Sequence, residues 1–370
     1  MTIEPFRLER FFAAHEFSTP HLLSVSDCES MTVAELLALE PGARQALERV
    51  WLGYTESRGG EALRGALAAA HPGLGPDDFL VHAGGVEVLL TVALASLEPG
   101  DHAVVQAPCY QAARSAPALA GARVSLWSGD VDRGWKPDLD ALPTLLDRPR
   151  TRLLVVNTPH NPTGYHFTLD ELRRILAAAE SRGVRVLVDE AYRGAEYRDE
   201  DRLPPAATLS PTAGALGLLS KGFGLPGLRL GWLASRDHAF LDRVARVKDY
   251  TTICAPAPVE FLGALALRHR EPILARSRGL LNGNLAALAA FMDRHRDRFR
   301  WMPPRAGSVC LPLLRDGDAE AFCARAREQA GVLLAPGPLF DGERAAFRIG
   351  FGRAGFREGL AVLEDGLARG

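Results

Sequence analysis

Short apolar runs alternate with longer amphipathic stretches from about Leu47 to Trp232. This alternation predicts strands that alternate with helices around a mostly parallel sheet. Most of the runs are rich in Val, Leu or Ala, which is typical of strands buried on both faces. The clearest predicted strands are 102–107, 123–127, 153–156, 184–188 and 214–219.

Helices fit the intervals between these runs. We expect one over 61–70 after a Gly-Gly start, a second over 86–96, and a third over 169–182, between Thr168 and Gly183. Thr before a helix and Gly after it are capping signals. The order of elements predicts an α/β fold, in which ligands bind at the carboxyl ends of the strands.

The composition changes after Pro258, where an Ala-, Leu- and Arg-rich helical region reaches about Arg296. We expect an interruption of this region near 279–283. We also expect a large α/β domain over 45–255 and a smaller α+β domain formed by 1–44 and 256–370. The smaller domain has strand candidates at 308–313, 332–335 and 346–351 and a final helix from Phe356.

Composition and charge narrow the function. With 370 residues, 47% hydrophobic and 24% charged, the chain can form a sizeable core, and 43 basic against 45 acidic residues leave a net charge of −2. No long block of one sign occurs, so we expect no nucleic acid or membrane partner. The five cysteines are spread out without a C-x-x-C pair, which indicates reduced thiols and no metal site. The first twelve residues lack the apolar core of a signal peptide, so we expect a cytoplasmic protein.

The segment LSKGFGLPGLRLGW, over 219–232, places Lys221 directly after an apolar run and follows it with glycine-rich turns and Arg229. A lysine at the end of a buried strand can lose enough hydration to act as a nucleophile. Taken alone, S-K-G also fits a surface lysine in a glycine-rich loop. The motifs elsewhere in the chain favour the nucleophile.

Two further predicted strands end in polar side chains. In LLVVNTPHNPTG a strand runs into a loop with Asn157 and Asn161, although alone such a loop could be a plain connection. In VRVLVDEAY, Asp189 and Tyr192 come just past an apolar strand. A carboxylate there is costly to bury without a cationic partner, and a protonated pyridine nitrogen would be such a partner.

In this order and spacing, N-x-P-H-N-P-T-G, D-E-A-Y and S-K-x-x-G-L-P-G-L-R-x-G-W resemble the class I and II aminotransferase family of fold-type I enzymes that use pyridoxal phosphate (PLP). The resemblance runs over nearly the whole chain. It implies the fold-type I PLP-dependent transferase fold, in which helices cover both faces of a mostly parallel central sheet beside a smaller α+β domain. It also implies PLP as cofactor and an aminotransferase that moves the amino group of an L-amino acid to a 2-oxo acid.

The resemblance assigns roles around the cofactor ring by position. Lys221 would form the imine with the cofactor and then move the proton between the substrate α carbon and the cofactor C4′ atom. Asp189 would pair with the pyridine nitrogen. Tyr192 and Asn161 would hydrogen-bond the phenolic oxygen, and Tyr110, in APCY, would stack on the ring.

The loop HAGGVE opens a predicted helix, whose free N–H groups favour an anion. The resemblance places the cofactor phosphate there, on Gly84, Gly85 and Val86, with a further contact from Arg229. Tyr54, in Y-T-x-S-x-G-G-x-x-L-R, matches a residue that reaches the phosphate of the neighbouring subunit. A homodimer with shared active sites is therefore implied.

The substrate contacts also follow from the resemblance. Arg348, in FRIGFG, matches the arginine that binds the substrate α-carboxylate, which its planar guanidinium suits. Asn157 matches a residue that supports the same carboxylate. Singly, Tyr110 could be a core residue, Gly84 and Gly85 a plain helix start, and Arg348 a surface arginine. Together, all of these would have to coincide with one template.

Two departures from the family pattern bear on the prediction. Many relatives have Ser or Thr three residues before the lysine, but this chain has Leu218, so we expect Ser220 to supply that phosphate contact or the contact to be lost. The glycine-containing loop that often closes over substrate is here LLSVSDCES, residues 22–30. Its Asp27 and Glu29 could attract a guanidinium or ammonium group, or could be capping residues of a solvated loop.

The segments FRLERFF, SDCESMTVAELLAL and KDYTTICAPAP are similar to those of capreomycidine synthases, PLP enzymes that act on a hydroxylated arginine by elimination and ring closure. The sequence therefore leaves a lyase or cyclase reaction open beside transamination. A PLP-sensing regulator would need an added helix-turn-helix domain, for which the chain has no spare length. A catalytically inactive relative would not need all four lysine, aspartate, tyrosine and arginine positions. No second arginine dedicated to an acidic substrate side chain is identifiable.

Overall fold

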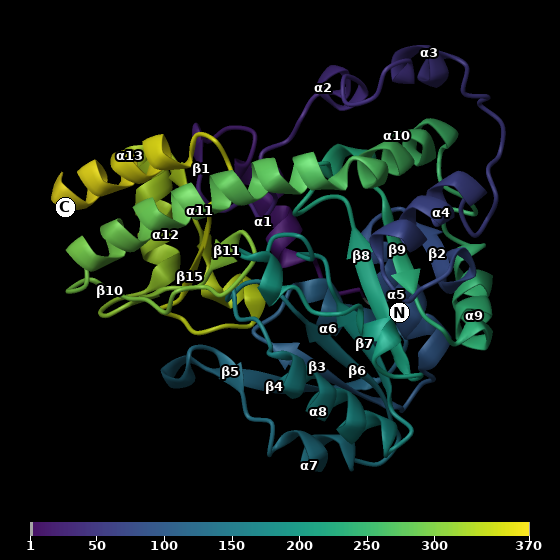
Figure 1. Cartoon of the computed structure of the whole chain (residues 1–370). Helices are drawn as coiled ribbons and strands as arrows, with labels where there is room; N and C mark the ends of the chain where they lie inside the picture. The colour runs from purple at the N-terminus through teal and green to yellow at the C-terminus, as the bar shows by residue number, and fades with distance from the viewer. Residues whose placement is uncertain (1–2, 370) are drawn as a thin grey trace.

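The computed structural model describes residues 3–369, which are built around one eight-stranded sheet (Figure 1). In order across the sheet, the strands are β2 (Phe79–His82), β9 (Gly231–Ala234), β8 (Ala213–Leu218), β7 (Arg185–Asp189), β6 (Thr151–Asn157), β3 (His102–Ala107), β4 (Arg123–Asp130) and β5 (Lys136–Pro137). The strands from β8 to β4 pair in parallel. Among the described strands of this sheet, β9 and β5 run in the direction opposite to all the others. The predicted mostly parallel sheet is confirmed.

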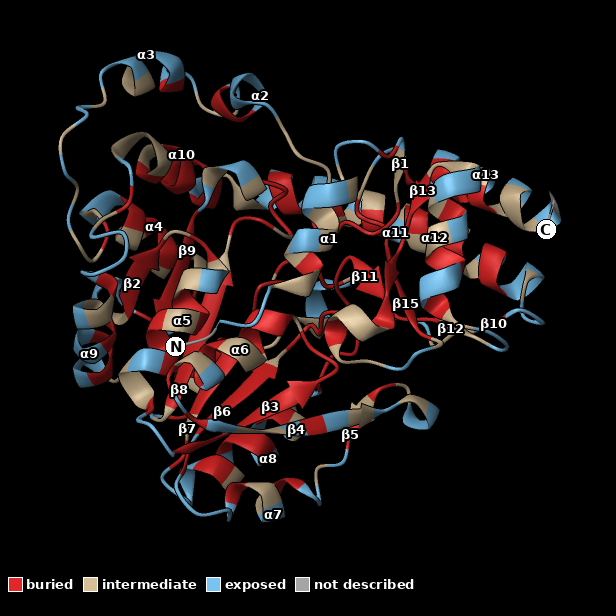
Figure 2. Ribbon diagram, turned by 180° about the vertical axis from the view of Figure 1, so that it is seen from behind, coloured by how far each residue is buried: buried red, intermediate tan, exposed pale blue. Residues whose placement is uncertain are grey.

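Helices cover both faces of the sheet, because successive side chains of a strand point to opposite faces. In β6, Leu153 and Val155 join one apolar cluster, whereas Leu154 and Val156 join the other. Burying each such side chain contributes roughly 1.5–3 kcal/mol. Figure 2 shows the buried strands between the helix layers. The first face is covered by α5 (Gly85–Ser96), α6 (Gln111–Leu119) and α9 (His238–Lys248), and the second by α4 (Glu61–Ala70), α8 (Leu169–Glu180) and α10 (Ala257–Arg268).

The five predicted strands and three predicted helices of this part are all present and differ only at their ends. The Thr168 side chain caps α8 by accepting a hydrogen bond from the N–H of Glu171 at 3.2 Å, and Gly183, after the helix, has a φ of +64°. The sequence did not predict β2 and β9. Each has only four residues, too few to show an alternation, and β9 begins at a glycine.

The C-terminal part forms a smaller α+β unit. Its aromatic core contains Phe299, Phe322 and Phe347, whose ring centroids lie 5.0–5.9 Å apart. The N-terminal segment joins this unit through β1 (His21–Leu22), which pairs in parallel with β13 (Val332–Leu333). The other elements of the unit are α11 (Arg270–Arg294), α12 (Ala319–Ala330), α13 (Phe356–Arg369), β10 (Phe299–Arg300), β11 (Val309–Cys310), β12 (Leu313–Leu314), β14 (Ala335–Pro336) and β15 (Phe347–Gly350).

The predicted interruption near 279–283 is wrong, because α11 is continuous through Gly279 and Gly283. The break lies instead at His269, between α10 and α11. Glycine is tolerated at position 283 because α13 approaches closely there, and the Gly283 carbonyl accepts a hydrogen bond from Arg357 Nη2 at 3.0 Å. Apolar residues of α11 buried on both sides of this position keep the helix intact.

Two short helices, α2 (Val33–Leu37) and α3 (Ala43–Glu48), lie on a stretch of chain that loops away from the body (Figures 1 and 2). The segment that follows α3 exposes large hydrophobic side chains. Trp51 is 79% exposed, and Leu52 and Tyr54 are similarly open. A contiguous set of this kind on one segment is typical of an interface.

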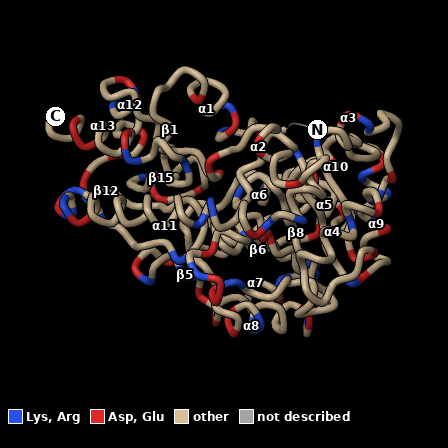
Figure 3. Tube along the Cα trace, turned by 45° about the horizontal axis from the view of Figure 1, so that its top comes forward, with Lys and Arg blue, Asp and Glu red and all other residues tan. Residues whose placement is uncertain are grey.

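The domain division at 44/45 and 255/256 stays a prediction. Helix α10, which it assigns to the smaller domain, packs against α4 of the sheet unit. Residues 1, 2 and 370, at the ends of the predicted smaller domain, lie outside the described residues. Basic and acidic positions are interspersed along the trace (Figure 3). Between residues 3 and 369, no helix combines the length and the apolar character needed to cross a membrane.

The two glycines of α11 predict different responses to alanine. Nothing within 4 Å would meet a Cβ at Gly279, whereas a Cβ at Gly283 would lie 2.8 Å from Arg357 Nη2. We therefore expect Gly279→Ala to raise the free energy of unfolding by roughly 0.5–1 kcal/mol. Gly283→Ala should gain less, because Arg357 must move away. Urea unfolding of both variants checks this, and a larger gain for Gly283→Ala would contradict it.

Candidate active site

A cavity of about 650 Å³ lies where the parallel strands end. Parallel strands present their carboxyl ends at one edge of a sheet, so side chains that follow different strands meet there. Asn157 ends β6, Asp189 ends β7, and Lys221 follows β8. Most of the predicted site residues line this cavity: Gly85, Val86, Tyr110, Asn157, Asn161, Asp189, Tyr192, Ser220, Lys221, Arg229 and Arg348.

The amino group of Lys221 points into the cavity wall formed by the N-terminal segment. Its Nζ donates a hydrogen bond to Ser26 Oγ at 2.7 Å and lies 5.9 Å from the centroid of the Tyr192 ring. Burial lowers the pKa of Lys221, against the opposing effect of Asp27. A lowered pKa increases the fraction of neutral amine, which is the nucleophilic form.

Among the described residues, no positively charged side chain forms an ion pair with the carboxylate of Asp189. Its Oδ1 accepts a hydrogen bond from the Ala191 N–H at 2.9 Å. Burial raises the pKa of Asp189 to about 6. Asn157 Nδ2 donates to the Asp189 carbonyl at 2.8 Å, which ties the ends of β6 and β7 together. The site therefore offers a carboxylate that a cation would stabilise.

Tyr192 and Arg348 are almost fully buried in the cavity wall, at 2% and 1% exposure. The Tyr192 hydroxyl has no hydrogen-bond partner among residues 3–369, and leaving such a group unpaired costs roughly 1–3 kcal/mol. Arg348 Nη1 donates to Asn161 Oδ1 at 2.9 Å and Nη2 to the Ser24 carbonyl at 2.6 Å, while Nε has no described partner. Both groups can bind a ligand's polar atoms.

The start of α5 lies beside Arg229, and its free N–H groups can bind an anion. Gly84, with φ +91°, precedes the helix, and a Cβ there would lie only 2.6 Å from Arg229 Nη2. Glycine thus lets the guanidinium approach the free N–H groups of Gly85 and Val86, which begin the helix. Leu218 also lines the cavity near Gly85, and Ser220 lies close by.

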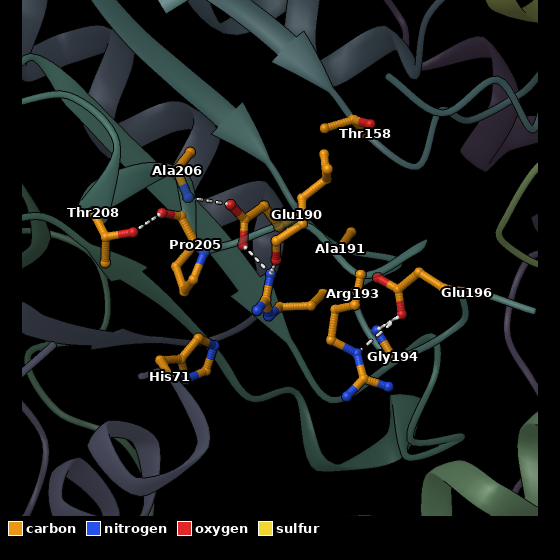
Figure 4. A network of polar contacts seen from close by, with 12 residues as sticks. His71, Thr158, Glu190, Ala191, Arg193, Gly194, Glu196, Pro205, Ala206 and Thr208 are labelled. Atoms are coloured by element: carbon orange, nitrogen blue, oxygen red, sulfur yellow. Dashed lines mark hydrogen bonds and ion pairs between the residues drawn. The ribbon is translucent and has the colours of Figure 1, made fainter. Parts of the chain in front are cut away.

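A buried polar network that includes Glu190, Arg193 and Glu196 lies in the turn after β7 (Figure 4). Glu190 accepts a hydrogen bond from the Ala206 N–H at 2.7 Å and pairs with Arg193 at 3.5 Å. Glu196 accepts from the Gly194 N–H at 2.8 Å. Burial raises the pKa of Glu190, with Arg193 opposing. The network fixes the backbone on both sides of Tyr192.

Two predicted residues do not line the cavity. Gly84 stands behind it against Arg229, and Tyr54 is 85% exposed, so it does not contribute to the site of its own chain. Of the acidic pair suggested by the sequence, Asp27 pairs with Arg353 Nη2 at 2.6 Å, and Glu29 accepts a hydrogen bond from the Ala354 N–H at 2.8 Å. Glu29 does not line the cavity, and its hydrogen bond holds the loop over 22–30 against Ala354.

Several lining residues were not assigned to the site by sequence reasoning. Glu9 and Phe12 come from α1 (Arg7–His15), Glu16 follows it, and Ser26 and Arg353 come from segments far apart in the chain. Glu9 accepts a hydrogen bond from the Tyr110 hydroxyl at 2.8 Å. The amphipathic pattern of this helix shows that one face is buried but not which part of the fold covers it. The resemblance of FRLERFF and of SDCESMTVAELLAL to other enzymes was the only signal, and it assigned no role to these side chains.

The residues of the cavity fit pyridoxal phosphate. The unpaired Tyr192 hydroxyl suits the phenolic oxygen, Asp189 the protonated pyridine nitrogen, Lys221 the aldehyde, and the start of α5 with Arg229 the phosphate. Together with the sheet topology, this set defines the class of fold-type I PLP enzymes.

The family follows from comparison with known proteins. The profile of the family "Aminotransferase class I and II" matches residues 21–360. The chain belongs to this family, and its cofactor is pyridoxal 5′-phosphate.

Similar proteins include enzymes with different reactions. Capreomycidine synthase of Streptomyces vinaceus is 30% identical over 99% of this chain and 93% of its own length. The crystal structure of a PLP-dependent aminotransferase from Streptococcus suis superposes with a TM-score of 0.92 at 30% identity, covering 100% of this chain and 98% of that one. The PLP-dependent cyclase OrfR superposes with a TM-score of 0.89 at 31% identity, over 100% and 97% of the two chains.

The raised pKa of Asp189 predicts a pH effect on the cofactor-free protein. Because the folded-state pKa of about 6 exceeds the ordinary value of about 3.9, stability falls as pH rises between the two values. Asp189→Asn keeps an acceptor for the Ala191 N–H but removes the charge. We expect it to be more stable than wild type at pH 7, by up to about 2–3 kcal/mol, and the gap to close toward pH 4. Urea unfolding at both pH values measures this, and a gap that widens toward pH 4 would contradict it.

Proposed function

We propose that the enzyme moves the amino group of an L-amino acid to a 2-oxo acid. The observation that carries this proposal is the position of Lys221, a half-buried residue whose amino group shares one cavity with Asp189, Tyr192 and Arg348. A lysine of lowered pKa can both bond to the cofactor aldehyde and return as a base.

Each residue of the site then has a task. When bound, the cofactor supplies an electron sink for negative charge at the substrate α carbon. Asp189 holds the proton on the pyridine nitrogen, and Tyr192 and Asn161 bind the phenolic oxygen. Tyr110 packs on the ring, held by its hydrogen bond to Glu9. Lys221 Nζ would act as the base and acid that moves the proton between the substrate α carbon and the cofactor C4′ atom.

Arg348 orients the substrate through its α-carboxylate. Its guanidinium is already fixed by Asn161 and the Ser24 carbonyl and stacks over the Phe340 ring at 4.6 Å. A fixed guanidinium binds a planar carboxylate with little loss of conformational freedom. Asn157 supports the same end of the substrate.

Tyr54 serves the site of a second subunit in this proposal. Its exposure, together with that of Trp51, Leu52 and Tyr250, supports a homodimer in which this segment reaches the partner's phosphate site. Such a segment would explain why large hydrophobic side chains lie open on a single chain.

A lyase or cyclase reaction on a modified amino acid is the second candidate. It is supported by capreomycidine synthase and the cyclase OrfR, both similar over nearly the full chain at 30–31% identity. The two reactions share the removal of the α proton by Lys221. They differ in whether a proton is returned or a substituent leaves.

An absorption titration separates the two candidates. Purified protein is mixed with a panel of amino acids, including arginine and its hydroxylated derivatives, without a 2-oxo acid. Stoichiometric conversion to the pyridoxamine form with release of a 2-oxo acid supports transamination and identifies the donor. Product formation with the starting absorption band regenerated supports the lyase or cyclase reaction instead.

Lys221→Ala should abolish the covalent attachment of the cofactor and lower turnover by at least about 10³-fold, because the site loses both its nucleophile and its base. The absorption band of the lysine-bound cofactor and the rate with the best amino acid are the measurements. Turnover retained in this variant would remove the proposed role of Lys221.

Tyr54→Phe tests the shared site. We expect the variant to stay dimeric but to bind the cofactor about tenfold more weakly, because one hydrogen bond to a phosphate is worth roughly 1.5 kcal/mol. Trp51→Glu should instead weaken the dimer, as seen by sedimentation velocity. A monomeric wild-type protein would contradict the shared site.

A further inference from the structure

Two carboxylates that line the active-site cavity have no assigned contact with the cofactor or the substrate. The acids that the sequence singled out are engaged elsewhere, Asp27 with Arg353 and Glu29 with the Ala354 N–H. The remaining ones, Glu9 and Glu16, come from α1 and the residue that follows it.

Helix α1 is fixed in its place over the cavity. The Arg7 guanidinium pairs with Asp341 at 2.7 Å, and the Arg7 N–H donates to Gln111 Oε1 at 2.9 Å. Leu8 is buried against Phe340 in the same small cluster. These contacts anchor the helix to both parts of the fold, so the positions of Glu9 and Glu16 are set by the structure.

Each cationic side chain that lines the cavity has an anionic partner or an expected ligand group other than Glu9 and Glu16. Lys221 serves the cofactor aldehyde, Arg229 the phosphate, Arg348 the substrate α-carboxylate, and Arg353 is neutralised by Asp27 at 2.6 Å. Asp189 is matched by the pyridine nitrogen. Once cofactor and substrate backbone are bound, Glu9 and Glu16 are left as the unmatched charges.

Glu16 is the more open of the two to a ligand. Its half-buried carboxylate makes no hydrogen bond or ion pair with any residue between 3 and 369. Burial, and after it the carboxylate of Asp27, raise the pKa of Glu16, with Arg353 opposing. Glu9 accepts one hydrogen bond, from Tyr110, which leaves its second oxygen free of hydrogen bonds to the described residues.

Independent features mark the same cavity as a ligand site. The Tyr192 hydroxyl and Arg348 Nε are buried, belong to residues that line it, and lack partners within the described residues. The volume of about 650 Å³ holds more than a cofactor ring and an α-amino acid backbone, so it leaves room for a side chain.

We propose that Glu9 and Glu16 select an amino acid whose side chain carries a positive charge, an ammonium or a guanidinium. This inference rests on the proposed function, because it assigns the side-chain subsite of the amino-acid substrate. An acidic side chain would meet two unmatched carboxylates. Arg353, the other cation near the entrance, does not favour an acidic side chain because Asp27 already neutralises it.

Matched ligand pairs test the charge requirement on the cofactor-loaded enzyme. Arginine is compared with citrulline, and lysine with norleucine, which are close in size but lack the cation. We expect the basic member of at least one pair to half-saturate, by absorption and by calorimetry, at a concentration at least about tenfold lower than its neutral partner. Equal binding within both pairs, tighter binding of glutamate, or no binding of either basic amino acid would overturn the proposal.

Glu9→Gln and Glu16→Gln test the residues. In Glu9→Gln the new amide oxygen can still accept the Tyr110 hydrogen bond, so the ring stays oriented. We expect each variant to reduce the basic-to-neutral preference about tenfold, and the double variant to abolish it. Binding of the neutral partner should change less than about twofold in Glu16→Gln, because the Glu16 carboxylate holds none of the described residues in place. Glu358→Gln, an exposed site on α13 that does not line the cavity, is the matched control and should keep the wild-type preference.

The two proposals can fail separately. If both members of a pair weaken equally in the variants, Glu9 and Glu16 are structural and the selection of a cation is wrong. If no amino acid changes the absorption spectrum, the proposed reaction is wrong, but calorimetric binding of arginine against citrulline still decides the inference.

Discussion

The guanidinium of Arg348 is a buried charge that joins three distant parts of the chain. It comes from β15 near the C-terminus, donates to Asn161 in the loop after β6, and donates to the Ser24 carbonyl of the N-terminal segment. A buried charge is costly unless its hydrogen bonds are met. The position of the smaller unit against the sheet is therefore coupled to the residue that is expected to bind substrate.

The same constraint explains the state of the other groups at the sheet edge. The parallel strands bring polar side chains to one place, where the surrounding apolar core removes water. Asp189 and Lys221 respond with pKa values shifted toward their neutral forms, and the Tyr192 hydroxyl has no described partner. These groups cannot satisfy one another, but a cofactor with an anion, a ring cation, a phenolic oxygen and an aldehyde can satisfy all of them.

In the proposed site, the residues expected to bind the cofactor and those expected to select the substrate come from different parts of the chain. The residues expected to face the cofactor come from the sheet edge and from loops whose motifs are those of the family. The residues that face the remaining space come from α1, from the Ser26 segment and from Arg353. Relatives of similar identity include an aminotransferase, a cyclase and capreomycidine synthase, so a change of reaction does not require a change of sheet.

The sequence by itself determined which polar residues follow the apolar strands. Strands buried on both faces need continuous apolar runs, and a polar residue of the site stands at or just after the end of β6, β7 and β8. Asn157, Asp189 and Lys221 could be assigned from local pattern and resemblance alone. It did not determine the continuity of α11, because the cost of Gly279 and Gly283 is overcome by packing with α13 and with the core. The tertiary structure alone decided that Glu9, Glu16 and Arg353 join the cavity, since an amphipathic helix or an exposed-looking charge carries no signal of what lies opposite it. It also decided that Asp27 pairs with Arg353 and that Glu29 accepts a hydrogen bond from Ala354. The sequence could not show these contacts, because the partners lie more than three hundred residues away in the chain.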